Sequence, residues 1–366
     1  MRVVFVSEVP TSYRAPLFQR LRDVMDLHVL YCAASDPWRG SVRSQFGPHE
    51  VILDGVSLGG KRGGIHWKLN PSVWRRLSSL RPDVVVISGY AHPTMQIAML
   101  WCRTKRVPYV LHSESNDLTP RPLWRRVLKA PIVKWAIRGS DSFLPVSKSA
   151  AEYLVRRGGD PARMFVLPNA PDVEQIARET HSIVRDATHF PTFLFVGRLV
   201  PAKDPRTLLN AFSLVRDEVT GARLSIIGEG PLRPALEAQC ARQSIGGVAF
   251  LGFIDQSELP SRYADSDCFI LPSTYEPYGV VVLEAMAAGL PVILSDRVGS
   301  AQDLVRPGEN GFIFRSGDRE DLAGCMRAVA SGGKGNMGAC AREMALLHTY
   351  DKAVETVMEA ARCAVS

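Results

Sequence analysis

The chain has 366 residues, of which 46% are hydrophobic and 22% charged, and its formal net charge is +7. This length is too great for one typical domain and fits two. No apolar run reaches the ~20 residues of a membrane-spanning helix. The opening MRVVFVSEVP is typical of a buried first strand, and not of a secretion signal, because an acidic residue ends its short apolar run. Seven scattered cysteines without a CxxC pair indicate reduced thiols in a cytoplasm and argue against a structural zinc site.

Short apolar runs alternate with amphipathic helical stretches along the chain. In the first half we expect strands at 2–7, 27–31, 84–88, 109–112, 142–146 and 165–167, and helices at 15–25, 71–80, 93–104 and 148–156. The second half repeats the pattern, with strands at 192–196, 224–228, 248–251, 268–271, 291–294 and 311–314. Near-continuous runs of Val and Ile indicate strands buried on both faces, and therefore parallel sheets covered by helices. The pattern predicts an α/β protein with two doubly wound, Rossmann-like parallel-sheet domains.

The domain boundary is expected between residues 169 and 191, where the core pattern fades. We assign residues 1–175 to an N-terminal domain, 190–347 to a C-terminal domain and 348–366 to a terminal helix. The glycine-rich stretch 331–338 is expected to be a mobile loop or a weak helix junction. Open α/β sheets bind ligands beyond the carboxyl ends of their strands. Two such domains facing a cleft would bind a donor on one side and an acceptor on the other.

The charge is unevenly divided between the halves. Residues 1–180 hold 26 Lys and Arg against 15 Asp and Glu, a net +11, whereas residues 181–366 hold 18 against 22, a net −4. A basic surface suits nucleic acid, anionic lipid or a phosphorylated acceptor. No zinc finger, aromatic RNA-binding strand or basic zipper accompanies it, so we expect no nucleic-acid partner and an anionic acceptor or membrane surface on the first domain.

The segment EPYGVVVLEAMAAGLPV, residues 276–292, places Glu276 and Glu284 eight residues apart. Pro277 and Gly279 predict a turn, and the apolar run predicts a helix from about Gly279. The first N–H groups of a helix and its dipole attract phosphate. Two helical turns rise roughly 11 Å at ~1.5 Å per residue. Glu276 can therefore face one end of an elongated ligand while Glu284 binds hydroxyls at the other, an arrangement that suits the sugar, diphosphate and ribose of a nucleotide sugar.

Two cations follow the strand predicted at 192–196. Arg198 comes after Gly197, which lets a backbone and a ligand approach closely, and Lys203 begins the next helix. Two positive charges after one strand can neutralise a diphosphate and stabilise the negative charge that grows on it as a leaving group.

These segments together resemble GT-B glycosyltransferases of the retaining family 4, whose signature is Glu-x7-Glu. The matching blocks follow in the family's order: FLFVGRLVPAKDPRTLLNAF (193–212), LSIIGEGPLR (224–233), VAFLGFID (248–255) and CFILPSTYEPYG (268–279). The N-terminal half matches loosely through SFLPVSKSAAEYL (142–154) and FVLPNAPDVE (165–174), in which Ala170 replaces the usual glycine. The resemblance implies the GT-B fold and a last helix, 350–364, that crosses back to the first domain.

The resemblance also implies a set of site residues. Those expected to bind the donor are Arg198, Lys203, Gly228, Glu229, Gly252, Phe253, Glu276, Pro277, Tyr278, Gly279, Val280 and Glu284. Glu276, Arg198, Lys203 and His112 are expected to act in the reaction itself. In the family the matching Arg and Lys act without a metal, and no DxD motif stands among the matched blocks, so we expect no metal and no cofactor. The resemblance also implies a UDP- or GDP-sugar as donor. The alternative for His112 is a hydrogen-bonded or solvent-facing histidine.

The first loop departs from the family pattern. Many members have a Gly-rich loop after strand one, but this chain has SEVPTSYRAPLFQRL (7–21), which resembles a subset of bacterial polysaccharide glycosyltransferases. Arg14 is a candidate to bind phosphate or the acceptor in place of the missing glycines, since guanidinium matches phosphate well. Glu114 and Asp117, which follow His112, are candidates to face the acceptor.

The basic segment RPLWRRVLKAPIVKWAIR, residues 121–138, carries Trp124 and Trp135. Tryptophans and cations on an amphipathic stretch suit a membrane interface. The alternative is a sheet-covering helix with cations that extend to solvent. Pro131 is expected to interrupt the segment.

We therefore predict a cytoplasmic, retaining, metal-independent glycosyltransferase, peripheral to the inner face of the cell membrane. It would move a hexose or N-acetylhexosamine from a nucleotide sugar to a glycan or lipid-linked acceptor in bacterial cell-surface polysaccharide assembly. The matched motifs supply no carboxylate nucleophile for double displacement, so the departing phosphate is expected to accept the acceptor's proton. The alternatives are an enzyme with a small free acceptor such as a sugar phosphate, a sugar-nucleotide-binding protein without transfer activity, and a related epimerase.

Overall fold

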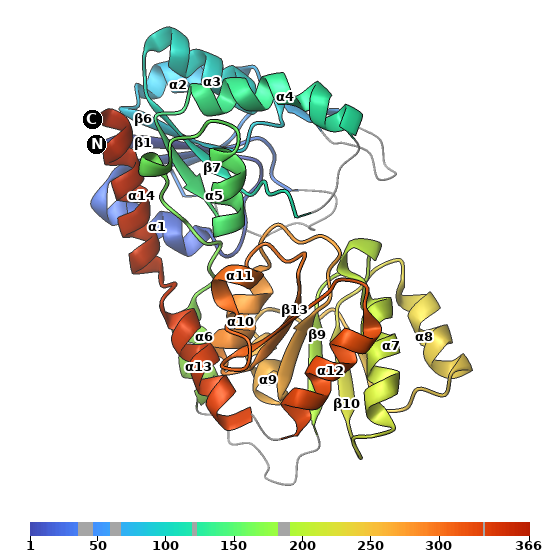
Figure 1. Ribbon diagram of the computed structural model, residues 1–366. Coiled ribbons are helices and arrows are strands. Elements are labelled where there is room, and N and C mark those ends of the chain that lie inside the picture. Colours follow the sequence, from blue (N-terminus) through green and yellow to red (C-terminus); the bar gives the residue numbers. More distant parts are fainter. Residues whose placement is uncertain (36–46, 59–66, 119–122, 182–190, 332–333) are drawn as a thin grey trace. The chain divides into compact units, whose positions relative to one another are not determined.

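The computed structural model describes residues 1–35, 47–58, 67–118, 123–181, 191–331 and 334–366, with the backbone alone described at 123, 125, 126, 334 and 335 (Figure 1). The chain divides into two compact units. Unit 1 comprises Met1–Asn169 and Tyr350–Ser366, and unit 2 comprises Ala170–Thr349.

Unit 1 contains a six-stranded sheet in the order β3-β2-β1-β6-β7-β8, in which every pairing is parallel. Its strands are β1 (Arg2–Ser7), β2 (Asp26–Tyr31), β3 (Glu50–Ile52), β6 (Val84–Ser88), β7 (Tyr109–Ser113) and β8 (Ser142–Pro145). A separate antiparallel hairpin pairs β4 (Val56–Leu58) with β5 (Trp67–Leu69). The helices are α1 (Ala15–Val24), α2 (Ser72–Leu80), α3 (Pro93–Lys105), α4 (Leu123–Arg138), α5 (Lys148–Val155), the 3-10 turn η1 (Pro161–Arg163) and α14 (Tyr350–Val365).

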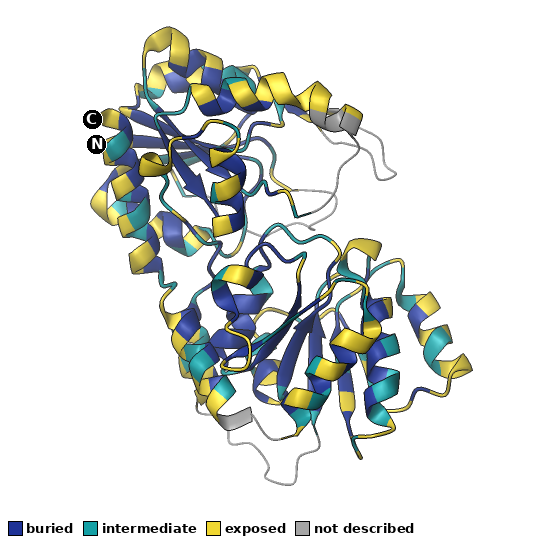
Figure 2. Ribbon diagram, in the orientation of Figure 1, coloured by how far each residue is buried: buried dark blue, intermediate teal, exposed yellow. Residues whose placement is uncertain are grey.

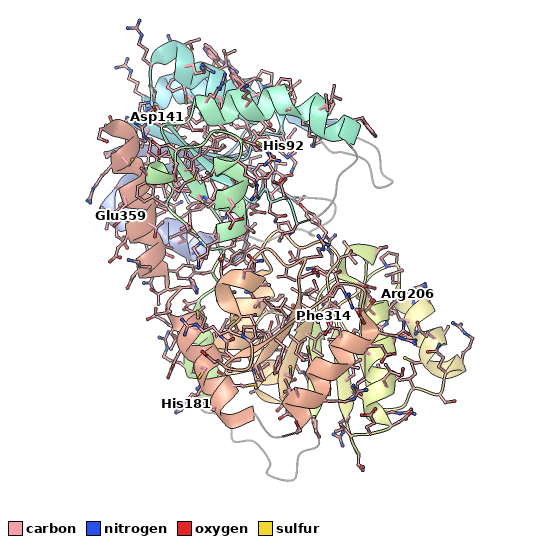
Figure 3. The ribbon with its side chains drawn as sticks, in the orientation of Figure 1. His92, Asp141, His181, Arg206, Phe314 and Glu359 are labelled. Carbon is pink, nitrogen blue, oxygen red and sulfur yellow. The ribbon has the colours of Figure 1, made fainter. Side chains whose placement is uncertain are left out.

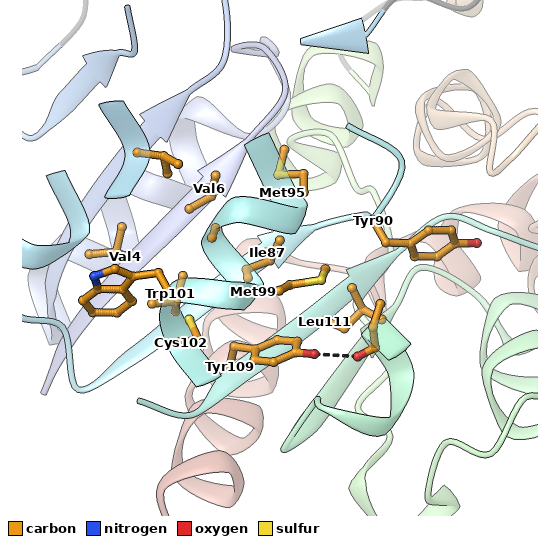
Figure 4. Packing of buried hydrophobic residues seen from close by; sticks show 14 of the residues in the cluster. Val4, Val6, Ile87, Tyr90, Met95, Met99, Trp101, Cys102, Tyr109 and Leu111 are labelled. Atoms are coloured by element: carbon orange, nitrogen blue, oxygen red, sulfur yellow. Dashed lines mark hydrogen bonds between the residues drawn. The ribbon is translucent and has the colours of Figure 1, made fainter. Parts of the chain in front are cut away.

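Two hydrophobic clusters form the core of unit 1, because apolar side chains alternate between the two faces of its buried strands. One cluster packs residues of α2, α3 and α4 against the sheet, and there the Tyr109 hydroxyl donates to the Ala136 carbonyl at 2.6 Å (Figure 4). The other packs residues of α1 and α14 against the sheet. In Figure 2 the strands are dark blue between helices whose outer sides are yellow, as expected of a sheet covered on both faces.

The last helix belongs to the core of unit 1 although it is far away in sequence. It lies beside α1 in Figure 1, and Val357, Ala360 and Ala361 are fully buried in the cluster that contains Phe18. The Ser142 hydroxyl donates to the Ala360 carbonyl at 2.7 Å. The C-terminal residues therefore complete the N-terminal unit.

Unit 2 contains a second six-stranded sheet in the order β11-β10-β9-β12-β13-β14, again parallel throughout. Its strands are β9 (Thr192–Val196), β10 (Arg223–Ile227), β11 (Val248–Gly252), β12 (Cys268–Leu271), β13 (Val292–Ser295) and β14 (Gly311–Phe314). Helix α10 packs against α6 and α13, and α7 packs against α8 and α12. The helices are α6 (Val173–His181), the 3-10 turn η2 (Pro201–Lys203), α7 (Pro205–Arg216), α8 (Arg233–Arg242), α9 (Leu259–Ala264), α10 (Val280–Ala287), α11 (Ala301–Leu304), α12 (Arg319–Ala330) and α13 (Lys334–Leu346).

The order of strands reverses once in each sheet. In unit 1 the reversal falls between β1 and β6, and in unit 2 between β9 and β12. The connections on the two sides of such a point leave in opposite directions, and ligands of open α/β sheets bind in the crevice that this opens at the carboxyl ends of the strands. The predicted fold class, two doubly wound parallel-sheet domains, is confirmed.

Three local predictions were wrong or incomplete. Residues 165–167 are not a strand, although Phe165 and Leu167 donate backbone hydrogen bonds to β8. Helix α4 runs unbroken from Leu123 to Arg138 with Pro131 inside it; this turn of the helix is exposed, so water can bond to the carbonyl that loses its partner. Of the glycine-rich stretch 331–338, residues 332 and 333 lie outside the described part, and α13 begins at Lys334.

We predict that Val357→Asp lowers the free energy of unfolding of unit 1 by about 3–5 kcal/mol, because it buries a charge without a partner. The matched control is Val365→Asp on the same helix, where the side chain is 52% exposed and the effect should stay within about 0.5 kcal/mol. All six tryptophans lie between residues 38 and 135, so tryptophan fluorescence during urea unfolding reports on unit 1. If both variants lost the same amount of unfolding free energy, α14 would not be part of this core.

Candidate functional site

The loops after β9 and β12 are joined at the strand reversal of unit 2. The Thr274 N–H donates to the Ala202 carbonyl at 2.9 Å. Glu276 is held on both sides, since its N–H donates to the Arg297 carbonyl at 3.3 Å and its carbonyl accepts from the Gly299 N–H at 2.9 Å. The backbone of Glu276 is therefore fixed to the loop that follows β13, and that of Thr274 to the loop that follows β9.

The structure brings two of the predicted reaction residues into direct contact. The Lys203 ammonium donates a hydrogen bond to the Glu276 carboxylate, and their side chains are only 18% and 14% exposed. Asp204 directly after Lys203 has φ +44° and caps α7 by accepting from the Thr207 N–H. Arg198 is exposed on the same loop. A positive and a negative group are thus held together at the end of the central strands.

The glycines of the 228–230 turn are required by the chain's own backbone. A Cβ at Gly228 would lie 2.0 Å from the Gly197 carbonyl oxygen, and one at Gly230 would lie 2.4 Å from the Leu199 carbonyl oxygen. Gly228 has φ +128° and donates its N–H to the Gly252 carbonyl at 2.7 Å. Glycine therefore lets the loops that follow β9, β10 and β11 pack together at the ligand edge of the sheet.

Helix α10 begins directly after Gly279, as predicted. Gly279 has φ +92°, a conformation that glycine adopts without strain, and it has no side chain to cap the first turn. Tyr278 is only 3% exposed, and its carbonyl accepts from the Ser300 hydroxyl at 2.5 Å. The ring of Tyr278 therefore belongs to the core, and only its backbone can reach a ligand.

Glu284 is buried on α10 and has a partner that the sequence did not predict. Its Oε2 accepts from the Tyr263 hydroxyl at 2.8 Å. Burial raises the pKa of the Glu284 carboxyl, while the Tyr263 hydrogen bond acts in the opposite direction. Tyr263 lies on α9 in the stretch SRYADSDCF, which looks like ordinary core, and the signal for its role is that a buried tyrosine hydroxyl needs a partner.

The other predicted donor residues lie at the same edge. Glu229 forms an ion pair with Arg233, Gly252 has φ +73°, and Phe253 is 77% exposed. Pro277 and Val280 are half-buried beside the start of α10. The predicted set thus follows strands β9 to β12, where the strand order places ligand-binding loops.

A second polar cluster lies in unit 1 and contains three predicted residues. Nη2 of Arg14 contacts His112 Nε2 at 3.2 Å, Glu114 Oε1 at 3.4 Å and Asn169 Oδ1 at 3.0 Å. Asn169 in turn donates to Glu114 Oε1 at 2.9 Å. Asp117 is not part of this cluster, because it pairs with Arg156 and Arg157 instead.

His112 is neutral in this arrangement. Burial lowers its pKa well below the ordinary value, and the Arg14 charge lowers it further. Because guanidinium only donates hydrogen bonds, His112 Nε2 is the acceptor and the ring proton lies on Nδ1. The cluster therefore holds a fixed neutral imidazole at the carboxyl end of β7.

Two kinds of feature are absent from the described residues. No group of three or more His, Cys, Asp or Glu side chains is arranged to hold a metal ion. No helix in the described ranges has both the length and the apolar character needed to cross a membrane. All seven cysteines are free thiols.

Comparison with known families matches nearly the whole chain. The family model "Glycosyl transferases group 1" matches residues 177–338, and "Glycosyl transferase 4-like domain" matches residues 11–170. The chain belongs to the group 1 glycosyltransferases of GT-B fold.

Two relatives of this chain carry different names and match it over similar lengths. The chain is 28% identical over 277 residues to sulfoquinovosyl transferase SQD2 of Arabidopsis thaliana. The matched region covers 71% of this chain and 52% of that protein. It is 30% identical over 260 residues to a glycogen synthase of Mycobacterium tuberculosis. This matched region covers 69% of the present chain and 61% of the glycogen synthase. The chain thus matches between about half and three-fifths of the length of these relatives.

Solved structures show the same fold at low sequence identity. HepE of Anabaena in complex with UDP superimposes with a TM-score of 0.74 at 19% identity, covering 98% of this chain and 99% of HepE. Sucrose-phosphate synthase of Thermosynechococcus elongatus superimposes with a TM-score of 0.73 at 18% identity, covering 99% of this chain and 98% of the synthase.

We predict that Glu284→Gln stabilises unit 2 at pH 8. A carboxyl whose folded pKa is raised contributes stability below its unfolded pKa, and loses this contribution as the pH rises through the folded value. Glu284 is therefore unfavourable for folding at pH 8, and the gain in unfolding free energy from Gln should shrink as the pH falls toward 4.5, the ordinary pKa of glutamate.

The measurement is urea unfolding followed by far-UV circular dichroism at both pH values, with tryptophan fluorescence reporting on unit 1 as an internal reference. Glu309→Gln, whose parent side chain is 66% exposed, is the matched control and should show no such pH-dependent difference. A Glu284→Gln protein less stable than the parent at pH 8 would contradict this description of the site.

Proposed function

We propose that this protein transfers a glycosyl group from a nucleotide diphosphate sugar to an acceptor hydroxyl. The observation that carries the proposal is the Lys203–Glu276 pair beside the start of α10, with the buried Glu284 on that helix. Membership of the group 1 glycosyltransferases supports it, as does the fold shared with HepE, which binds UDP.

The diphosphate would lie between the start of α10 and the two cations. The first N–H groups of α10 point at an anion, and Lys203 and Arg198 neutralise the charge that develops as the glycosidic bond breaks. Glu276, anchored by Lys203, would accept hydrogen bonds from hydroxyls of the donor sugar. Glu284, held by Tyr263, would bind the ribose hydroxyls.

We further propose that the configuration at the anomeric carbon is retained without a covalent intermediate. The departing phosphate would accept the proton of the acceptor hydroxyl on the same face of the sugar. His112 would lie near the reacting sugar as a neutral ring, held by Arg14. Since Nη2 makes all the Arg14 contacts described above, Nε and Nη1 are the atoms with which Arg14 would meet phosphate or the acceptor.

The setting we propose is the inner face of a bacterial membrane, with a glycan or lipid-linked acceptor. Helix α4 supports it, because Trp124, Val127 and Leu128 are 63%, 64% and 71% exposed on a helix that also carries five cations and no acidic residue. These three residues follow the i, i+3, i+4 spacing of one helix face. Apolar and basic groups together favour an anionic bilayer.

We predict that Lys203→Ala lowers kcat by about a hundredfold or more, since it removes a charge aimed at the leaving group. Transfer and release of free nucleoside diphosphate should be measured together against a panel of UDP- and GDP-sugars. Arg242→Ala, an exposed cation at the end of α8, is the control and should keep normal turnover. Unchanged turnover in Lys203→Ala would contradict the role of Lys203 in stabilising the leaving group.

Turnover should also persist in EDTA, because two protein cations take the part that a divalent ion plays in other transferases. Activity assayed in an excess of EDTA should equal that with added Mg²⁺ or Mn²⁺. Loss in EDTA with recovery on adding either ion would reject metal independence.

For membrane association we expect binding to vesicles of phosphatidylglycerol and phosphatidylcholine that weakens as salt rises. Replacing Arg125, Arg126 and Lys129 together by Gln should weaken it by about a hundredfold, at ~1 kcal/mol per charge near the surface. Leu128→Ser should weaken it as well, whereas Val365→Ser, another exposed apolar position, should not.

Co-sedimentation is the measurement. If the parent protein does not bind these vesicles but transfers to a sugar phosphate, the small-acceptor alternative is correct. If it binds nucleotide sugars but releases no nucleoside diphosphate with any acceptor, it is a binding protein.

A further inference from the structure

A buried lysine lies in unit 1 outside the groups assigned so far. Lys68 is the middle residue of β5, and its side chain is 3% exposed. Its Nζ lies 3.3 Å from Glu8 Oε1 but makes no hydrogen bond within the described residues. An ammonium group has three N–H donors, and leaving buried donors unmatched is unfavourable. Lys68 is therefore a buried cation whose charge faces the Glu8 carboxylate.

His92 faces the same carboxylate oxygen as Lys68. His92, labelled in Figure 3, precedes α3, and its Nε2 lies 3.3 Å from Glu8 Oε1. The backbone N–H of Lys68 donates to His92 Nδ1 at 3.3 Å, so the neutral ring carries its proton on Nε2. Glu8 is one-third exposed and is the member of the three that reaches solvent.

The hairpin that carries Lys68 is fastened to the sheet by buried hydrogen bonds. The Thr94 hydroxyl donates to the Lys68 carbonyl at 2.8 Å. Nδ2 of Asn70 donates to the carbonyls of Cys32 at 3.1 Å and Leu53 at 2.9 Å, just beyond β2 and β3. Fixed supporting groups of this kind hold a binding side chain in one geometry.

These residues lie at the strand reversal of unit 1. Glu8 follows β1, and His92 follows β6, the two neighbouring strands between which the order reverses. Ser88, the last residue of β6, also has a buried hydroxyl oxygen without a hydrogen-bond partner in the described part of the chain. The position is the one at which open parallel sheets bind ligands.

We propose that Glu8 binds the hydroxyl groups of a sugar acceptor, and that Lys68 and His92 position its carboxylate for this. The exposed part of the carboxylate accepts hydrogen bonds from hydroxyls, while the buried Lys68 ammonium and the His92 N–H face the carboxylate and hold it in place. The charges of Lys68 and Glu8 cancel, and Glu8 would repel phosphate, so the site fits a neutral polyol better than an anion. This inference rests on the proposed function and specifies the acceptor as a sugar ring at this point.

The test is saturation-transfer NMR on the full chain with the methyl α-glycosides of glucose, galactose, mannose and N-acetylglucosamine. We expect at least one to bind, and Glu8→Gln and Lys68→Met each to weaken that binding by about tenfold, as for loss of a charged hydrogen bond. The matched control is Glu50→Gln, which alters the ion pair of Glu50 with Arg22 at the start of β3, the opposite edge of the sheet, and it should bind like the parent.

Each outcome decides the question. If no glycoside binds the parent, or if Glu8→Gln binds as the parent does, the proposal is wrong. If inorganic phosphate binds and is lost in Lys68→Met while no glycoside binds, the site is an anion site. Tryptophan fluorescence checks that unit 1 of each variant is folded, and if Lys68→Met is not, Glu8→Gln decides alone. UDP binding is measured in parallel, so failure of the donor site is seen separately.

Discussion

Parallel pairing with one reversal of strand order determines where chemistry can occur in each unit. All strands of a sheet end at the same edge, and only at the reversal do neighbouring loops turn away from each other and leave room for a ligand. In unit 2 the loops on either side of that point contain Lys203 and Glu276. In unit 1 they contain Glu8 and His92. The two candidate sites of this chain are thus consequences of one topological rule applied twice.

Compensation of buried charge explains how these sites are compatible with a stable fold. Lys203 neutralises Glu276, Tyr263 donates to Glu284, and Arg14 is matched by Glu114. The Tyr263 hydrogen bond does not fully compensate the burial of Glu284, because the pKa of this carboxyl is still raised. Proteins commonly keep such locally unfavourable groups where function requires them. A carboxylate on an otherwise apolar helix is unfavourable for stability, but under the proposed function it would bind ribose, so stability and binding would oppose each other at this position.

The sequence was sufficient to predict the fold class and most strands, because runs such as the Val-rich 84–88 can only be buried on both faces. It missed β3 and the β4–β5 hairpin, since three-residue strands have too little pattern to detect. The order of motifs placed Glu276 and Lys203 in one site, but their ion pair spans 73 residues and depends on side-chain conformations that no local pattern encodes. The same holds for Tyr263 with Glu284 and for Lys68 with Glu8, which come from elements that folding alone brings together.

The central claim is that a nucleoside diphosphate binds at the strand reversal of unit 2. Hydrogen–deuterium exchange on the full chain with saturating UDP, and separately GDP, tests it most directly. At least one nucleotide should slow exchange in peptides that cover residues 197–204, 228–232 and 276–286, because ligand contacts and hydrogen bonds at these backbone N–H groups suppress local opening. Protection confined to peptides of unit 1, or no protection by either nucleotide, would contradict the account.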